Sequence, residues 1–324
     1  MEGAGETKTT ACVTGAGGFV ASWLIKLLLS RGAGRYTVHG TVRDPGDAKN
    51  AHLAALDGAA ERLRLFKADL LDYGSMAAAI AGCDVVFHVA CPVPASPLSN
   101  PEVEMLAPAL TGTMNVLKAC SEAKVKRVVV VSSVSAVMLN PSWPQGKAMD
   151  EGCWTDVDYC RTTENWYSLG KTLAELEAFD YAKRTGLDVV TVCPSLVIGP
   201  LLQPTVNASS SVIVDFFRGD SEVKSKTRNV VDVRDVADAL LLVYETPEVS
   251  GRYICSSHAT KVSDVIEMLK SMYPTYKYAD KFVQVTEEPS FCSRKLEMLG
   301  WKIKALEETL RDSVESYKAA AVLD

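Results

Sequence analysis

The sequence lacks several features that would assign it to a membrane or to nucleic acid. Its apolar runs are short, such as Val128 to Val131, whereas a helix needs ~20 apolar residues to cross a bilayer. It has no cluster of Lys and Arg, and its 34 basic residues are outnumbered by 40 acidic ones, so the formal charge is 34 − 40 = −6. We therefore expect no membrane-spanning segment and no nucleic-acid partner.

Metal ligands and disulfide patterns are also scarce. The four histidines are scattered, no pair of cysteines has the CxxC spacing, and the cysteine count of nine is odd. The N-terminal stretch from Met1 to Thr10 is polar and does not resemble a secretory signal. We expect reduced thiols, no metal site and a cytoplasmic protein.

What is present is a globular composition, with 48% hydrophobic and 23% charged residues in 324. Short β-branched runs alternate with helical patterns, which predicts a Rossmann-type, doubly wound parallel α/β sheet. We expect a cofactor-binding unit over residues 1–194 and a smaller, mostly helical substrate-binding region over 195–324, some of whose later segments return to the sheet. The expected strands are Thr9–Thr14, Tyr36–Val42, Leu63–Lys67, Asp84–Val89, Arg127–Ser132 and Asp188–Cys193, and one long helix is expected from Thr162 to Arg184.

A glycine-rich turn follows the first expected strand. Gly15, Gly17 and Gly18 let the backbone approach a pyrophosphate, and Phe19 and Val20 open the next helix, whose free N–H groups face the phosphate charge. Such a turn also occurs as a plain connection. Between a first strand and a first helix it predicts a dinucleotide site.

The end of the second strand indicates which dinucleotide binds. Arg43 follows this strand and Lys49 lies beyond it, and two cations suit the 2′-phosphate of NADP. The alternative is a solvated basic loop balanced by Asp44 and Asp47, and one of these aspartates can also serve NAD. We expect NADPH as the cofactor.

After the third strand, Asp69 and Leu70 are candidates to receive the adenine. Asp69 can equally be the N-cap of a helix expected from Tyr73 to Ile80.

A catalytic pair is expected in the long helix. Tyr167 and Lys171 are four residues apart and so lie on one face, one turn apart. A phenol is a weak acid with a pKa near ~10, and a nearby ammonium makes it a better proton donor. This spacing is common by chance, but downstream of a dinucleotide turn it predicts reductive chemistry.

A hydroxyl at the end of a neighbouring strand is expected to bind the carbonyl oxygen on which charge develops. Ser132 and Ser133 end the fifth strand, and we select Ser133. Either hydroxyl can instead simply cap the strand.

With these sites the chain resembles the extended short-chain dehydrogenase/reductases, in the plant branch that holds cinnamoyl-CoA reductases and dihydroflavonol reductases. The similarity spans nearly the whole chain, and its carriers are the stretches Val13–Trp23, Gly40–Pro45, Lys67–Asp72, Asn165–Lys171 and Gly199–Ser209. The stretch from Glu151 to Trp154 is similar to the cinnamoyl-CoA reductases in particular.

The resemblance implies an NADPH-dependent oxidoreductase of phenylpropanoid carbonyls, with hydroxycinnamoyl-CoA thioesters as the first candidate substrates and a place in lignin biosynthesis. It also implies roles for individual residues. Ser133, Tyr167 and Lys171 would be catalytic, and the cofactor would be held by the glycine-rich turn together with Arg43, Lys49, Asp69, Leu70, Lys171, Pro194 and Val197.

The chain also departs from the family. Ser168 and Leu169 replace a Cys and a Tyr of the catalytic motif of typical cinnamoyl-CoA reductases. Family positions with His, Lys and Arg near the CoA phosphates fall on Val212, Asp215 and Val262. A carboxylate facing a polyphosphate is unfavourable, which weakens the thioester interpretation.

Several alternatives stay open at this point. An aldehyde or ketone reductase of the dihydroflavonol type would use the same catalytic residues, a nucleotide-sugar epimerase would share the fold, and a non-catalytic dinucleotide sensor would need only the cofactor site. Cys153 and Cys160 are either buried thiols or a reversible disulfide. The pattern sets no oligomeric state.

Overall fold

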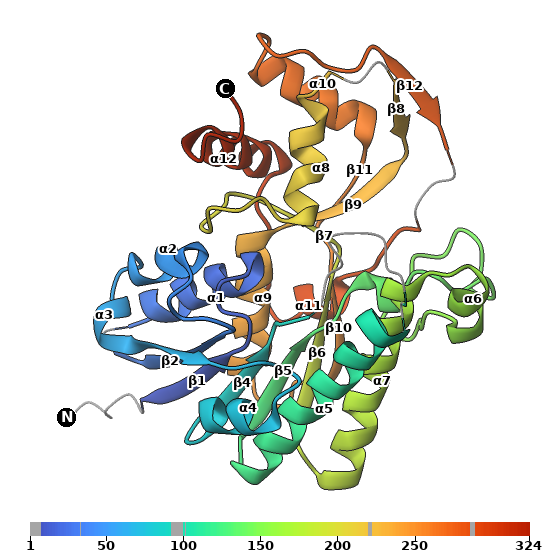
Figure 1. The fold of residues 1–324 in the computed structure, drawn as a ribbon. Coiled ribbons are helices and arrows are strands. Elements are labelled where there is room, and N and C mark those ends of the chain that lie inside the picture. Colours follow the sequence, from blue (N-terminus) through green and yellow to red (C-terminus); the bar gives the residue numbers. More distant parts are fainter. Residues whose placement is uncertain (1–7, 33, 92–99, 101, 220–221, 286–288) are drawn as a thin grey trace.

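The computed structural model describes residues 8–324 except 33, 92–99, 101, 220–221 and 286–288. Its centre is a seven-stranded parallel sheet (Figure 1). The strand order is β10 (Gly251–Cys255), β6 (Val189–Pro194), β5 (Arg127–Val131), β4 (Val85–His88), β1 (Thr9–Val13), β2 (Tyr36–Val42) and β3 (Leu63–Lys67). The predicted doubly wound, Rossmann-type sheet is confirmed.

Two layers of helices cover this sheet, and the reason lies in its strands. Val128, Val129 and Val130 of β5 are all buried, so both faces of the sheet need apolar cover. The helices α1 (Phe19–Ser30) and α9 (Val233–Glu245) pack together on one face, and the other face carries α4 (Tyr73–Ile80), α5 (Ala107–Glu122) and α7 (Trp166–Thr185).

The strand order reverses between β1 and β4. From β1 the chain moves through β2 to β3 on one side, and it then crosses back to β4 on the other side. In open α/β sheets a ligand crevice lies at such a point, beyond the carboxyl ends of the strands. The turn after β1 and the ends of β4 and β5 therefore define where the site must be.

Residues after 194 contribute to both parts of the molecule. A three-stranded sheet joins β7 (Leu196–Ile198), β9 (Thr227–Asp232) and β11 (His258–Lys261), and β8 (Glu222–Ser225) pairs with β12 (Lys281–Gln284). The helices α8 (Ala208–Phe216), α10 (Val262–Met272) and α12 (Leu306–Ala319) pack with the three-stranded sheet around a separate apolar core. We call this part the upper region, after its place in Figure 1.

The described part of the region after residue 194 has more helical than extended residues, but it also holds six strands, β7 to β12, that the sequence did not reveal. These strands are short, and several, such as Glu222–Ser225, are largely polar, so they give little alternation. The expected return to the sheet does occur: β10 pairs with β6, while α9 covers the sheet beside α1.

The long helix expected from Thr162 to Arg184 is present, but it begins four residues later than expected. The structure has α6 (Val157–Thr162) and α7 (Trp166–Thr185), separated at Glu164, whose φ is 53°. The Asn165 side chain then caps α7 by accepting from the Ser168 N–H at 3.2 Å. Other short elements are η1 (Ala48–Asn50), α2 (Ala51–Ala54), α3 (Ala59–Arg62), η2 (Glu102–Leu106), η3 (Val134–Ala136) and α11 (Arg294–Glu297).

Candidate active site

The glycine-rich turn is held tightly against the end of β4. Gly15 has φ +67°, and its N–H donates to Thr41 Oγ1 at 3.1 Å. A Cβ at Gly15 would lie 3.0 Å from Ala90 Cβ, and a Cβ at Gly17 would lie 2.0 Å from Asn50 Oδ1. Both positions therefore require glycine, because neighbouring groups occupy the space of a side chain.

The turn leads into a helix end that fits a phosphate. Gly18 is the N-cap residue of α1, with φ −81° and no side-chain cap, so the N–H groups of the first turn, at Phe19 and Val20, receive no capping side chain. Such a helix end attracts anions. The predicted residues of the turn thus come together in a form that fits the pyrophosphate of a dinucleotide.

Arg43 and Lys49 differ in their surroundings. Arg43 is exposed at the end of β2, and within the described part of the chain it makes no hydrogen bond or ion pair. Lys49 binds Asp47 at 2.7 Å, so for Lys49 the alternative of a balanced basic loop describes the observed state. This pairing is the main reason that the pKa of Asp47 is lowered.

Asn50 was missed in the sequence. Its side chain is buried, its Nδ2 donates to the Asp44 carbonyl at 2.9 Å, and its Oδ1 lies against Gly17. Asn50 therefore connects the loop that carries Arg43 to the phosphate turn. The signal available was only its distance of seven residues from Arg43, which is too weak to single it out.

Asp69 and Leu70 follow β3, as expected. The N-cap of α4 is Asp72, which accepts from the Gly74 N–H at 3.0 Å, and not Asp69. Asp69 Oδ1 instead accepts from the Leu71 N–H at 2.9 Å. Asp69 is exposed and Leu70 lines the cavity described below, so both remain candidates for a cofactor contact.

Pro194 and Val197 lie on the other side of the crevice. Pro194 ends β6 and is buried, and the half-buried Val197 lies in β7, where the chain leaves the sheet for the upper region. Between them, the Ser195 N–H donates to the Cys255 carbonyl at 3.0 Å. Their contact with a cofactor stays a prediction.

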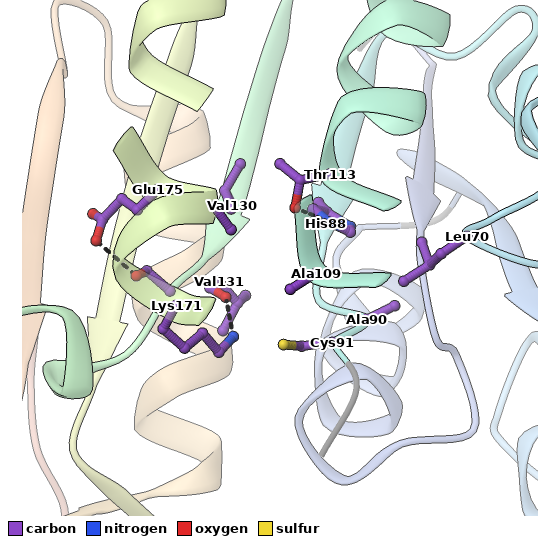
Figure 2. Close-up of a pocket in the computed structure, with 12 residues that line it drawn as sticks. Leu70, His88, Ala90, Cys91, Ala109, Thr113, Val130, Val131, Lys171 and Glu175 are labelled. Atoms are coloured by element: carbon purple, nitrogen blue, oxygen red, sulfur yellow. Dashed lines mark hydrogen bonds between the residues drawn. The ribbon is translucent and has the colours of Figure 1, made fainter. Parts of the chain in front are cut away.

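Tyr167 and Lys171 lie in the first turns of α7. Lys171 is 8% exposed, and its Nζ donates to the Val131 carbonyl at 3.1 Å (Figure 2). Burial alone lowers the pKa of Lys171, but the Cys91 thiol and the Tyr167 phenol outweigh it and raise this pKa to about 12. The lysine is therefore an ammonium at neutral pH, next to the tyrosine.

The two serines at the end of β5 have different environments. Ser132 is buried, and its hydroxyl donates to Glu175 Oε2 at 2.7 Å. Ser133 is half-buried and its Oγ accepts from the Ser135 N–H at 3.1 Å, which leaves its own proton to donate. This difference favours Ser133 as the carbonyl-binding hydroxyl.

A small cavity lies beside Lys171, between α5 and α7 (Figure 2). His88 lines it and is fully fixed: Thr14 Oγ1 accepts from two backbone N–H groups, so its proton goes to His88 Nδ1 at 3.0 Å. Burial, with a smaller effect of Lys171, lowers the pKa of His88 to about 3. His88 is therefore a neutral structural group, and it is not a proton carrier at neutral pH.

Cys153 and Cys160 are buried free thiols. Burial raises the pKa of both, so neither is activated as a thiolate. Of the two alternatives drawn from the sequence, the structure contains the reduced state.

The three positions that depart from the family lie in the upper region. Val212 and Val262 line one apolar cavity, formed by β7, β9, α8, α10 and α12. Asp215, near the end of α8, forms an ion pair at 2.7 Å with Arg218, which follows the helix. The cavity is lined mainly by apolar side chains, and the Asp215 carboxylate is paired with Arg218.

Fold and site together define a dinucleotide-dependent oxidoreductase. Residues 11–255 match the model of the NAD dependent epimerase/dehydratase family, and the chain belongs to this family. The similarity that the motifs predicted is confirmed by cinnamoyl-CoA reductase 1 of Petunia hybrida, which is 48% identical over 310 residues, covering 94% of this chain and 91% of that protein.

Solved structures of reductases share this fold. Vestitone reductase from alfalfa has a TM-score of 0.83 and 31% identity, with 98% of this chain and 100% of that chain covered. Gre2 from Candida albicans, solved in complex with NADPH, has a TM-score of 0.84 and 26% identity, with 96% and 99% covered.

No helix in the described residues combines the length and apolar character needed to cross a membrane. Within the same residues, no three His, Cys, Asp or Glu side chains are placed to hold a metal ion.

Proposed function

We propose that this chain is an NADPH-dependent reductase of phenylpropanoid carbonyls, of the cinnamoyl-CoA reductase type. One observation carries the proposal. Tyr167 and the buried ammonium of Lys171 lie one turn apart on α7. Lys171 donates a hydrogen bond to the carbonyl of Val131, the last residue of β5, and Ser133 follows this strand.

The residues present fit the cofactor. Gly15, Gly17 and the uncapped start of α1 would hold its pyrophosphate, and Arg43 would hold the 2′-phosphate. Lys171 would also bind the nicotinamide ribose. When bound, NADPH supplies the hydride for the reduction.

Residues of the chain stabilise and protonate the carbonyl oxygen of the substrate. Ser133 donates a hydrogen bond to this oxygen, where negative charge develops. Tyr167 donates its proton to the same oxygen, and the Lys171 ammonium stabilises the phenolate that remains. With a CoA thioester the protonated adduct is a hemithioacetal. Its C–S bond then breaks, the hydroxyl proton passes to the leaving sulfur, and the products are the hydroxycinnamaldehyde and free CoA.

A substrate panel tests the proposal. Purified protein is expected to oxidise NADPH in the presence of feruloyl-CoA and to release coniferaldehyde. Net consumption of NADPH excludes an epimerase, which recycles its cofactor. If none of a broad set of phenylpropanoid carbonyls is reduced, the proposal is wrong and a cofactor sensor becomes the better interpretation.

A second candidate is an aldehyde or ketone reductase that uses no CoA ester. It is favoured by Val212, Asp215 and Val262, because these three side chains offer no cation to the CoA phosphates. A kcat/KM for coniferaldehyde or a dihydroflavonol far above that for feruloyl-CoA would select it. If the protein reduces CoA thioesters, we propose that it does so in the cytoplasm and as a step of lignin biosynthesis.

A further inference from the structure

A buried ion pair joins α7, one turn beyond Lys171, to β10. Glu175 and Arg252 of β10 have side chains that are 1% and 5% exposed. They are joined by two parallel bonds, Arg252 Nε to Oε1 at 3.0 Å and Nη2 to Oε2 at 3.1 Å. This bidentate geometry fixes both side chains in direction as well as distance.

Arg252 uses its other donors on two loops. Nη2 donates to the Ala136 carbonyl at 3.1 Å, and Nη1 donates to the Cys153 carbonyl at 2.6 Å. The guanidinium also lies 3.5 Å from the ring centroid of Trp154. Arg252 therefore holds η3, which begins directly after Ser133, and the segment that precedes α6.

Glu175 completes the same network toward the strands. Its carboxylate accepts from Ser132 Oγ at 2.7 Å and from Thr191 Oγ1 at 2.5 Å. The bond to Ser132 turns that hydroxyl inward and fixes the backbone directly before Ser133. The ends of β5 and β6 are thus attached to one carboxylate.

The position of Glu175 on the helix links this network to the proton donor. Tyr167, Lys171 and Glu175 are spaced four residues apart and share one face of α7. Lys171 and Glu175 line the same cavity (Figure 2). Buried ion pairs are weak evidence for stability, because desolvation cancels much of the attraction. A role in the site accounts better for so many directed bonds.

We propose that Glu175, held by Arg252, is a positioning residue for the reduction: it fixes the Ser132–Ser133 strand end relative to α7 and supplies the negative charge that balances the cations behind Tyr167. The inference rests on the proposed function. It adds to the reaction two residues that touch neither the cofactor nor the carbonyl.

The charges around Glu175 make the electrostatic part testable. Burial raises the pKa of Cys193 far above its ordinary range, and His88 is neutral, so neither changes charge in the working range. Arg252 stays charged at any accessible pH. The groups that face Glu175 or line its cavity are Lys171 from α7, Arg252 from β10, Cys193 from β6, His88 from β4 and Cys91 after β4.

The test is Glu175→Gln, with Glu177→Gln as the matched control on the same helix, where Glu177 pairs with the half-exposed Arg184. Loss of the carboxylate leaves Arg252 unbalanced and favours the phenolate. The alkaline limb of the kcat/KM profile should move to lower pH by roughly half a unit, and kcat should fall about tenfold. The Kd for NADPH, measured by fluorescence, should stay unchanged.

The double variant Glu175→Gln/Arg252→Gln removes both charges of the ion pair. It allows the inference to be tested even if the single variant does not fold. It should return the alkaline limb to the wild-type position, while kcat stays reduced. A wild-type kcat in the double variant, or an unshifted limb in a folded Glu175→Gln protein, overturns the inference. If the wild-type protein itself reduces no carbonyl, the proposed function fails, which is a different outcome.

Discussion

The cofactor side of the crevice and the upper region are built on opposite principles. On the cofactor side, backbone N–H groups and glycines surround a place for phosphate, with a Cβ at Gly17 only 2.0 Å from Asn50. In the upper region, Val212, Val262 and their neighbours enclose an apolar cavity with packed side chains. The cofactor side is thus built from backbone geometry that a short motif reveals, whereas the upper region is built from side-chain packing between distant segments.

The largest effect is expected when the proposed proton donor is removed. Tyr167→Phe removes the proton donor, so kcat should fall by about 10²–10⁴-fold while the Kd for NADPH changes little. Tyr159→Phe on α6, whose ring is exposed, is the control and should keep full activity. Stopped-flow turnover and NADPH fluorescence measure the two quantities. Full turnover in Tyr167→Phe would remove this residue from the mechanism.

The next prediction compares how much Arg43 and Lys49, the two cations of the loop after β2, contribute to NADPH affinity. Arg43→Ala should weaken NADPH binding by roughly 10- to 100-fold and leave NADH binding nearly unchanged, because only NADPH carries the 2′-phosphate. Lys49→Ala should do less, since Lys49 is bound to Asp47. Titration of both cofactors measures this difference. Equal losses for NADPH and NADH would contradict the assignment.

A smaller effect compares two glycines with similar backbone angles. Gly15 has φ +67° and Gly146 has φ +73°, but only Gly15 has a neighbour, Ala90, within 3.0 Å of a built Cβ. Both alanine variants should lose similar stability from the strained angle. Only Gly15→Ala should also raise the Kd for NADPH, by about tenfold. Identical Kd values for the two variants would show that the close approach is unimportant.

The smallest effect concerns the joint between the sheet and the upper region. Asp235 on α9 accepts from the Lys304 N–H at 2.9 Å, and burial raises the pKa of Asp235 to about 7. The folded state thus holds this proton more tightly than the unfolded state, in which the pKa is ~3.9. The stability from this group is complete below about pH 4 and is lost as the pH rises to about 7.

Asp235→Asn should remove this dependence. Its Tm should exceed that of the wild type by roughly 2–4 °C at pH 8, and the difference should vanish near pH 4. Asp158→Asn is the control, because its side chain is 95% exposed. A pH-independent difference, measured by calorimetry, would show that Asp235 does not titrate across this range.

The sequence predicted the cofactor side well because its signals are local. The strands Tyr36–Val42 and Leu63–Lys67 begin and end at the predicted residues, and the other strands of the first half differ by one residue at one or both ends. Gly15 and Gly17 are required by contacts within one turn and its neighbours, so a short motif carries the information. The same holds for the four-residue spacing of Tyr167 and Lys171.

What the sequence did not reveal depends on distant contacts. Helix propensity continues through Glu164, and only the αL angle there and the Asn165 cap divide α6 from α7. Arg252 lies 77 residues beyond Glu175 along the chain, so no local pattern joins them. The polar strand β8 is defined by its pairing with β12, not by its composition.

The position of β10 at the edge of the main sheet also has a consequence for the protein while it is being synthesised. Until a ribosome has released residue 255, the edge of β6 is open and the Glu175 carboxylate has no buried guanidinium beside it. A nascent chain stopped at residue 250 would therefore present an unpaired strand edge beside an unpaired carboxylate, and such an edge favours aggregation.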